Sequence, residues 1–319
     1  MPRFDVTIAG ELNLDLVLYG LPAELAPERE LLASDMMFTL GGSSAIVAHN
    51  LALLSNRVGF ISRLGDDSMG QIALQRLAAA RVDVSQVRRA ADGTATGLSV
   101  ILQHGTWRNI LTYPGTISKL CFEDLDFDYL SSARHFHLSS FYLQTALQPR
   151  VAELFQELKA AGLTISMDTN DDPDDRWQGG LWDVLRYVDV FLPNEREVLK
   201  ITGEPKLEDA TRRLAEIVPL VVVKRGAEGA IAQRGTDRFS SRPMKVDAID
   251  TIGAGDSFDA GFISQYIRDA DVETCLAYGN LAGALSTTRP GGTEAFRERP
   301  HREEFFRENA IALENSSHG

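Results

Sequence analysis

The sequence predicts an α/β protein with a doubly wound, mostly parallel sheet, helices on both faces and a small β-sheet lid. Three observations predict this fold class: short apolar runs recur along the chain, helical patterns lie between them, and one strand-rich segment interrupts the alternation. Strands that alternate with helices usually pair in parallel, because each helix returns the chain to the same end of the sheet. A chain of 319 residues with 44% hydrophobic content can bury a core of this size.

The expected core elements follow one another as strand and helix. The predicted strands are residues 4–9, 58–61, 135–138, 163–167, 188–192 and 220–223, each a short apolar run. The predicted helices between them are residues 44–54, 69–80, 147–161, 180–187, 195–201 and 207–217. After residue 223 we expect a β-meander at 230–233 and 237–240, followed by helices at 254–268 and 272–287.

Two segments do not fit the parallel core and predict the lid. Residues 93–102 and 106–113 are rich in β-formers on both sides of 103–105, which is typical of a hairpin. The strand-like stretch 13–20 is a candidate for a further lid strand. We therefore expect one domain over residues 1–313 with lid segments at about 12–20 and 93–115, and a flexible tail at 314–319.

Charge and cysteine usage exclude several classes of partner. The formal net charge is -13, which repels nucleic acid phosphates and anionic lipids, so we expect neither nucleic acid nor membrane partners. The only two cysteines, Cys121 and Cys275, lie far apart and indicate no disulfide framework or zinc site. No apolar stretch reaches 18 residues and no leader is recognisable, so the sequence predicts a cytoplasmic protein.

The most informative motif is the glycine-rich turn at residues 250–258, which runs directly into an apolar-periodic helix. Its glycines let backbone N–H groups approach a ligand, and a helix start attracts anions. An aspartate at that position, Asp256, is suited to accept a proton from an attacking hydroxyl while the amides stabilise a transferring phosphoryl group. A helix N-cap beside a tight turn would explain the same residues.

Two weaker motifs have structural alternatives as well. The pair Gly41-Gly42 precedes a helix, so it could place a ligand against bare backbone or form only a turn and cap. Asn194 and Glu197 follow a predicted strand, at the edge of the sheet where open α/β proteins bind ligands. They could organise Mg²⁺ through waters, or serve as a helix cap with a first-turn acid.

The order of these three motifs resembles the ribokinase-like (PfkB-type) carbohydrate kinases, and the resemblance covers nearly the whole chain. It implies an ATP-dependent kinase that phosphorylates a hydroxyl of a sugar or sugar-like molecule, with ATP and Mg²⁺ as cofactors. In that family the counterpart of Asp256 is the catalytic base. The amides of Gly253, Ala254 and Gly255 would then form the anion hole for the transferred phosphoryl group.

The resemblance also implies roles for matching residues outside the last motif. On the acceptor side it indicates Asn13, Asp15, Gly41 and Gly42 as substrate contacts. On the nucleotide side it indicates Asn194 and Glu197 for phosphate and Mg²⁺, Lys224 near phosphate, Gly226 and Gly229 for close approach, and Asn280 at the adenine pocket. Asp250 and the loop 288–292 look like the two sides of the monovalent-cation site of many members. Because backbone carbonyls supply most of those ligands, the presence of K⁺ stays open.

Departures from the family pattern concern the acceptor. Ile46 stands where many relatives have an asparagine that reaches the sugar, and the Asp-x-Asn segment at 168–170 lacks the following arginine, whose place Asp172 takes. Asn170 is still expected near the substrate, and Asp172 argues against an acidic sugar. On the lid, Arg108 is a candidate substrate contact with a solvated surface residue as its alternative. Lids of the family often pair between subunits, which implies a homodimer.

Two other functions remain open at this stage. A nucleoside kinase would need an aromatic or apolar platform near the lid, for which the candidates are Phe38, Trp107, Tyr113 and Phe141. A non-catalytic binding protein on this fold is disfavoured by the intact Asp256 and glycine loop. His135 and His137 alternate on one strand and are expected to be packed or hydrogen-bonded rather than metal ligands.

Overall fold

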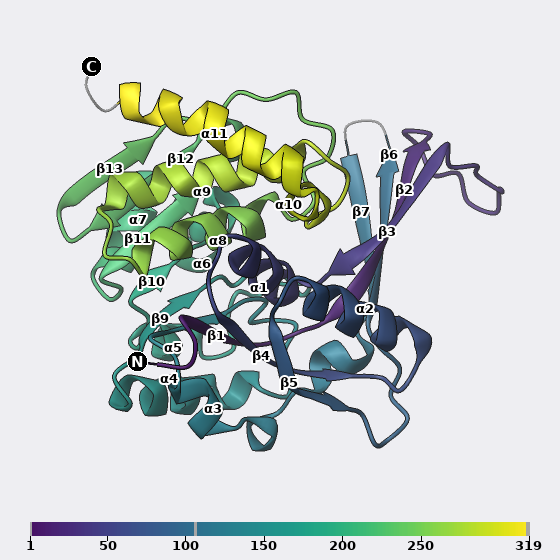
Figure 1. Ribbon diagram of the computed structural model, residues 1–319, viewed down its shortest axis with the longest axis horizontal. Coiled ribbons are helices and arrows are strands. Elements are labelled where there is room, and N and C mark those ends of the chain that lie inside the picture. Colours follow the sequence, from purple (N-terminus) through teal and green to yellow (C-terminus); the bar gives the residue numbers. More distant parts are fainter. Residues whose placement is uncertain (1, 105–106, 317–319) are drawn as a thin grey trace.

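A nine-stranded sheet runs through the computed structural model, which describes residues 2–104 and 107–316 (Figure 1). Its order is β13-β12-β11-β10-β9-β8-β1-β4-β5. The strands are β1 (Val6–Ala9), β4 (Val58–Leu64), β5 (Asp83–Arg89), β8 (His135–Leu138), β9 (Thr164–Met167), β10 (Val190–Phe191), β11 (Leu220–Lys224), β12 (Ala230–Arg234) and β13 (Asp237–Ser241). Pairing is parallel from β5 to β11 and antiparallel from β11 to β13, which confirms the predicted sheet and meander.

The strand order reverses at β1, whose neighbours are β4 on one side and β8 on the other. The chain continues from β1 toward β4 on one side of the sheet and from β8 toward β9 on the other side. A crevice therefore opens between these two connections, at the carboxyl ends of the strands. The segments that follow β1 and β9 both lead into that crevice. This topology fixes where distant parts of the sequence meet.

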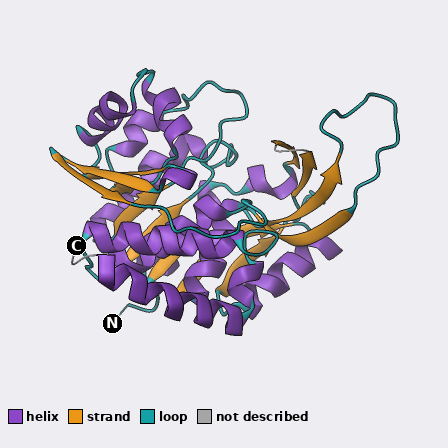
Figure 2. Ribbon diagram, turned by 90° about the horizontal axis from the view of Figure 1, so that it is seen from above, coloured by secondary structure: helices purple, strands orange, loops and turns teal. Residues whose placement is uncertain are grey.

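Helices cover both faces of the sheet, as Figure 2 shows. One face packs against α1 (Ser43–Leu53), α2 (Ser68–Ala79), α8 (Ala254–Tyr266) and α9 (Val272–Thr287). The other packs against α3 (Phe127–Ser131), α4 (Val151–Ala160), α5 (Leu181–Leu185), α6 (Glu195–Thr202) and α7 (Leu207–Ala215). Short α10 (Glu294–Arg297) and α11 (Arg299–Ser316) pack on α9, and 3₁₀ turns occupy Gly115–Lys119, Phe122–Asp124, Gln148–Arg150 and Gly226–Glu228.

A second sheet forms the lid, in the order β3-β2-β6-β7. It comprises β2 (Asn13–Leu21), β3 (Asp35–Gly41), β6 (Leu98–His104) and β7 (Trp107–Tyr113), and it projects beside the main sheet in Figure 1. The hairpin β6–β7 and the strand β2 agree with the predicted lid segments. Gly105 of the predicted turn and Thr106, the predicted start of the second strand, lie outside the described residues.

The structure contains two strands that the sequence did not predict, and its last helix reaches into the predicted tail. Strands β3 and β5 escaped prediction because β5 is a sheet edge and the first half of β3 is exposed, so neither reads as an apolar run. At the carboxyl end, α11 extends to Ser316 and therefore includes the start of the predicted tail, whose flexibility stays a prediction. Phe305 and Phe306 hold this helix by packing against the cluster around Leu285.

His135 and His137 belong to a closed ladder of buried hydrogen bonds, as expected. The rings of His135 and His137 both bond the hydroxyl of Ser166, at 2.7 and 2.8 Å. The other ring nitrogens bond Thr164 and Ser139, each at 2.8 Å. Every imidazole nitrogen in the ladder thus has a partner, and burial lowers the pKa of His135 to about 3.

Two further observations concern cysteines and membranes. Cys121 and Cys275 are both free thiols, in agreement with the sequence. Among the described residues, no helix combines the length and the apolar character that crossing a membrane requires.

Candidate active site

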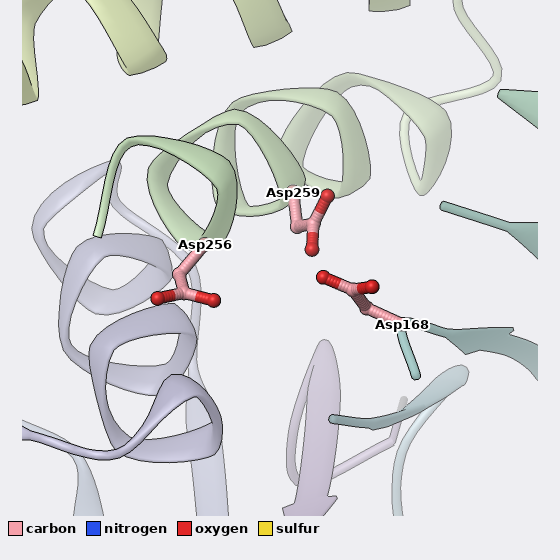
Figure 3. Close-up of side chains that lie close together, drawn as sticks. All are labelled: Asp168, Asp256 and Asp259. Carbon is pink, nitrogen blue, oxygen red and sulfur yellow. The ribbon is translucent and has the colours of Figure 1, made fainter. Parts of the chain in front are cut away.

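Asp256 lies in the first turn of α8, where the helix opens onto the crevice. The helix begins after Gly253, whose φ of 69° lies in the left-handed region that favours glycine. A Cβ at Gly253 would lie 2.5 Å from the Cα of Gly292, so the two backbones also need glycine to approach this closely. The side chain of Asp256 projects from α8 on the side of the helix where Asp168 lies (Figure 3), and the residue is 8% exposed.

The start of α8 carries the features of an anion site. Its first-turn N–H groups have no carbonyl four residues earlier in the helix, and the helix dipole adds positive potential there. The ammonium group of Lys224 lies 3.6 Å from the position that a Cβ on Gly255 would take. Of the three predicted amides, that of Ala254 already donates to the carbonyl of Thr251 at 3.3 Å.

Three carboxylates converge beside this anion site. One oxygen from each of Asp168, Asp256 and Asp259 lies within 4.8 Å of the others, as Figure 3 shows. Asp168 directly follows β9, and Asp259 lies one turn after Asp256 on α8. The ammonium of Lys224 joins two of them, at 2.6 Å from Asp168 and 3.1 Å from Asp259.

Sequence reasoning gave no role to Asp168 or Asp259. The i, i+3 spacing of Asp256 and Asp259 was the available signal, because residues three apart share one face of a helix. The predicted Lys224 is present at the anion site. In this structure its charge is engaged by the two carboxylates.

The electrostatics of the cluster favour proton uptake by Asp256. Burial raises the pKa of Asp256, and the charge of Asp168 adds to that shift. Lys224 and hydrogen bonding from Ser43 and Asn170 oppose it. Burial would lower the pKa of Lys224, but attraction to Asp168 and Asp259 raises it, so the lysine remains charged.

The predicted acceptor contacts line one wall of the crevice, at the start of β2 and the end of β3. A Cβ on Gly41 would lie 2.0 Å from the Asp15 carboxylate, and one on Gly42 would lie 2.5 Å from Asn13 Oδ1. The glycine pair therefore exists because two polar side chains need the space. Within the described residues, Asn13 Oδ1 is buried without a hydrogen-bond partner. Burial, followed by the charges of Asp256 and Glu11, raises the pKa of Asp15 to about 7.

A buried network that the sequence did not indicate supports Asn170. Glu11 accepts bonds from the hydroxyls of Ser44 and Ser140, at 2.7 and 2.8 Å. Ser140 also donates its N–H to Asn170 Oδ1 at 2.9 Å, and Asn170 donates to Ser43 at 3.0 Å. Ser140 and Asn170 both have left-handed φ values, of 55° and 53°, so the network holds a strained turn beside Asp256.

Asn194 and Glu197 form a capping box at the start of α6. The backbone N–H of Asn194 and its side-chain amide both donate to the Glu197 carboxylate. The helix-cap alternative is thus confirmed, and a role toward Mg²⁺ stays a prediction. Burial, followed by the charge of Asp168, raises the pKa of Glu197 to about 8.

The predicted nucleotide-side residues hold the chain around β13. A Cβ on Gly229, whose φ is 86°, would lie 2.2 Å from the carbonyl of Ser241. Asn280 donates to the same carbonyl at 3.2 Å and to that of Arg242 at 3.0 Å. Gly226, with φ 53°, begins the 3₁₀ turn between β11 and β12. Gly229 and Asn280 therefore hold the segment at the end of β13, and contact with adenine stays a prediction.

The lid reaches the loop before α8. Arg108 donates to the Thr251 hydroxyl at 3.1 Å, and Tyr19 donates to the Asp250 carboxylate at 2.7 Å. A cavity of about 480 Å³ lies at this junction. Its lining comprises Ile101, Gln103, Trp107 and Arg108 from the lid, together with residues 248–252.

Two sequence-based expectations about the acceptor need correction. The Asp172 carboxylate accepts bonds from the N–H groups of Asp174, Arg176 and Trp177, so it stabilises its own loop and gives no argument against an acidic sugar. Phe141 is fully buried in the core under the sheet and cannot supply a nucleobase platform. Trp107, by contrast, is 74% exposed at the cavity.

Fold and site together define a class of α/β proteins. In this class an acidic side chain lies beside a helix start that suits anions, at the point where the strand order of the sheet reverses. Within that class, the chain belongs to the pfkB family carbohydrate kinases, whose family model matches residues 3–299. This identification agrees with the resemblance noted in the sequence, and it makes the protein a member of a family of sugar kinases.

Relatives with known names extend the comparison. The chain is 33% identical to an ATP-dependent ribose-1-phosphate kinase of Halopiger xanaduensis, over 91% of this chain and 94% of that protein. It is 31% identical to a 2-dehydro-3-deoxygluconokinase of Bacillus subtilis, over 82% and 84%. A putative ribokinase II from E. coli, solved with ATP and Mg²⁺, superposes with a TM-score of 0.83 at 26% identity, covering 95% of this chain and 99% of that one.

Proposed function

We propose that this protein transfers the γ-phosphoryl group of ATP to a hydroxyl, in particular a hydroxymethyl, of a sugar or sugar-like molecule. The observation that carries the proposal is the buried carboxylate of Asp256 at the first turn of α8, beside N–H groups that no helical carbonyl satisfies. Asp256 accepts the proton of the attacking hydroxyl. The N–H groups around Gly253 and Gly255 stabilise the charge on the transferring phosphoryl group.

The residues present fit ATP and Mg²⁺. The N–H groups at the start of α8 and the ammonium of Lys224 supply positive potential for the phosphates, as the family relationship suggests. Glu197 and Asp168 supply the hard oxygen ligands that Mg²⁺ prefers, directly or through waters. When bound, the ion neutralises charge on the phosphates. Potassium is not part of this proposal, because the groups around Asp250 fit it poorly.

The acceptor wall fits a molecule that presents several hydroxyls. The unpartnered Oδ1 of Asn13 can accept from one hydroxyl, and Asp15 and Asn170 can accept from others. Among the described residues, the partner of the Arg108 side chain is the neutral hydroxyl of Thr251, so its charge remains available for an anionic group on the acceptor. Two reported relatives carry names that refer to anionic sugars, a sugar phosphate and a sugar acid.

The predicted homodimer through the lid belongs to the proposal. The face of the lid that points away from the crevice exposes Met36, Leu111 and Tyr113, each more than half exposed. Apolar surface of this kind favours burial against a second copy. Light scattering on the wild-type chain and on Leu111→Asp tests this point. A monomeric wild-type protein would contradict it.

The function is tested by acceptor-dependent ADP formation with MgATP and the full chain. The acceptor panel is ribose 1-phosphate, ribose, 2-dehydro-3-deoxygluconate, fructose, adenosine and cytidine. We expect at least one sugar or sugar derivative to raise ADP formation above the rate without acceptor, with a new phosphate monoester visible by ³¹P NMR. If ATP and an acceptor bind but no acceptor is phosphorylated, the protein is a binding protein and the proposed activity is wrong.

Adenosine and cytidine separate the nucleoside alternative within the same experiment. The exposed Trp107 at the cavity is the residue that could stack on a base. A preference for nucleosides that Trp107→Ala abolishes would replace the sugar assignment by a nucleoside one. A preference for free or phosphorylated sugars that Trp107→Ala leaves unchanged would uphold it.

A further inference from the structure

Three contacts from the lid converge on three consecutive residues that lead into the start of α8. The hydroxyl of Tyr19 bonds Asp250, Arg108 bonds Thr251, and Ile252 packs in a small apolar cluster with lid residues of β2 and β6. Gly253, the cap of α8, follows immediately. The position of the lid is therefore linked directly to the backbone that forms the anion site.

The Asp250 carboxylate is the centre of this junction. Its Oδ2 accepts from the Tyr19 hydroxyl at 2.7 Å and from the N–H of Gly291 at 3.0 Å, and its Oδ1 accepts from the N–H of Ile252 at 2.9 Å. Each carboxylate oxygen offers about two lone-pair sites, so Oδ2 is saturated. Asp250 thereby ties lid strand β2, the segment before α8 and the loop after α9 to one another.

These contacts fit a bound monovalent cation poorly. A cation needs oxygens with free lone pairs, yet Asp250 Oδ2 already accepts from two donors and Oδ1 accepts from a third. Nearby carbonyls are engaged as well: that of Thr287 accepts from the N–H of Ile249 at 2.8 Å, and that of Gly292 accepts from Asn50 at 3.0 Å. The hydroxyl of Tyr19 is a stable donor, because burial and the bond to Asp250 raise its pKa.

We propose that Tyr19 is a positioning residue whose hydroxyl takes the place of a monovalent cation at Asp250. It holds the carboxylate, and through it the N–H groups of Ile252 and Gly291, in the arrangement that shapes the anion site when the lid is in place. Activity is then independent of K⁺ and dependent on the lid contact. The inference rests on the proposed function for its kinetic consequence, but its structural consequence is independent of turnover.

The test compares Tyr19→Phe with Tyr187→Phe, which removes a hydroxyl that only makes an exposed contact with Gln156, outside the lid and the site. We expect Tyr19→Phe to lower kcat roughly tenfold, as the loss of one bond to a charged group in the transition state predicts, with the acceptor KM nearly unchanged. Hydrogen exchange in peptides covering 249–256 and 288–293 should accelerate in Tyr19→Phe and not in Tyr187→Phe. Equal exchange in both variants would overturn the positioning role.

Cation dependence is measured on the wild-type protein in KCl and in tetramethylammonium chloride at equal ionic strength. We expect the same melting temperature and the same rate in both salts. A higher melting temperature or a several-fold higher rate in KCl would overturn the inference. Melting and exchange need no turnover, so they decide it even if every acceptor fails, an outcome that would count only against the proposed function.

Discussion

Two buried polar regions of the same sheet differ in how completely their groups are paired. In the ladder between β8 and β9, both nitrogens of His135 and of His137 have hydroxyl partners. At the carboxyl ends of the strands, the ammonium of Lys224 bonds two of the three clustered carboxylates, those of Asp168 and Asp259, and among the described residues Asn13 Oδ1 has no hydrogen-bond partner. The first region satisfies itself, whereas the second retains charge and hydrogen-bonding capacity for a ligand.

The comparison shows that the buried carboxylates of the candidate site lower the stability of the fold while they remain available for chemistry. Buried polar groups that are fully bonded cost little and specify one packing, while unpaired buried carboxylates are costly. The pKa directions agree: burial lowers the pKa of the ladder histidines, which stay neutral, and raises that of Asp256. Removing a carboxylate from the acidic region should therefore lower activity without lowering stability, whereas removing a hydroxyl from the ladder should lower stability without lowering activity.

The largest effect is expected at Asp256. Asp256→Asn keeps the shape of the side chain but removes the base, so kcat should fall by roughly 10²–10⁴. The free energy of unfolding should not fall, because a buried charge is lost. Initial rates and urea unfolding measure the two quantities, with Asp128→Asn on the exposed side of α3 as the control. An unchanged kcat would remove Asp256 from the role of base.

Lys224 should have the next largest effect, in this case on stability. Lys224→Met leaves Asp168 and Asp259 without their shared cation, and breaking a buried pair from one side costs about 3–5 kcal/mol. Urea denaturation measures the loss. Adding Asp259→Asn to the variant should restore part of it. No restoration would mean that Lys224 stabilises the fold by packing alone.

Ser166→Ala probes the ladder. It removes the hydroxyl that both histidine rings share, so we expect a loss of about 2 kcal/mol in the free energy of unfolding. The rate per folded molecule should stay near that of the wild type, in contrast to Asp256→Asn. Ser131→Ala, which removes a hydroxyl with an exposed hydrogen bond at the end of α3, is the matched control. A large fall in kcat would show that the ladder takes part in the chemistry.

The smallest effect is a pH-dependent gain in stability at Asp15. The folded-state pKa of Asp15, about 7, exceeds the ordinary value near 4, so folding favours its protonated form. That contribution is present below about pH 4 and is lost as the pH rises through 7. Asp15→Asn should therefore be more stable than the wild type by about 1 kcal/mol at pH 8, with a smaller difference at pH 5. Urea unfolding at both values checks the sign, and a larger gain at pH 5 would contradict it.

The parallel sheet, the lid hairpin and the motif around Asp256 could be predicted because each is a local pattern of residues. The acidic residues that surround Asp256 from other parts of the chain could not be predicted. Asp168 and Glu11 reach the site from separate strands, and only the strand order brings them to α8. Tyr19 escaped for a similar reason, since its partner Asp250 lies 231 residues away. Asn194 was difficult for a different reason, because its local sequence pattern is compatible with both a helix cap and a ligand site. The structure shows the helix cap.

The close approach of Gly292 to Gly253 has a consequence for biosynthesis. The backbone that supports the anion site comes from the loop after α9, near the end of the chain. A nascent polypeptide that already contains Asp256 therefore lacks this support until the loop after α9 has been synthesised. The contact between Gly253 and Gly292 can form only after most of the chain has left the ribosome.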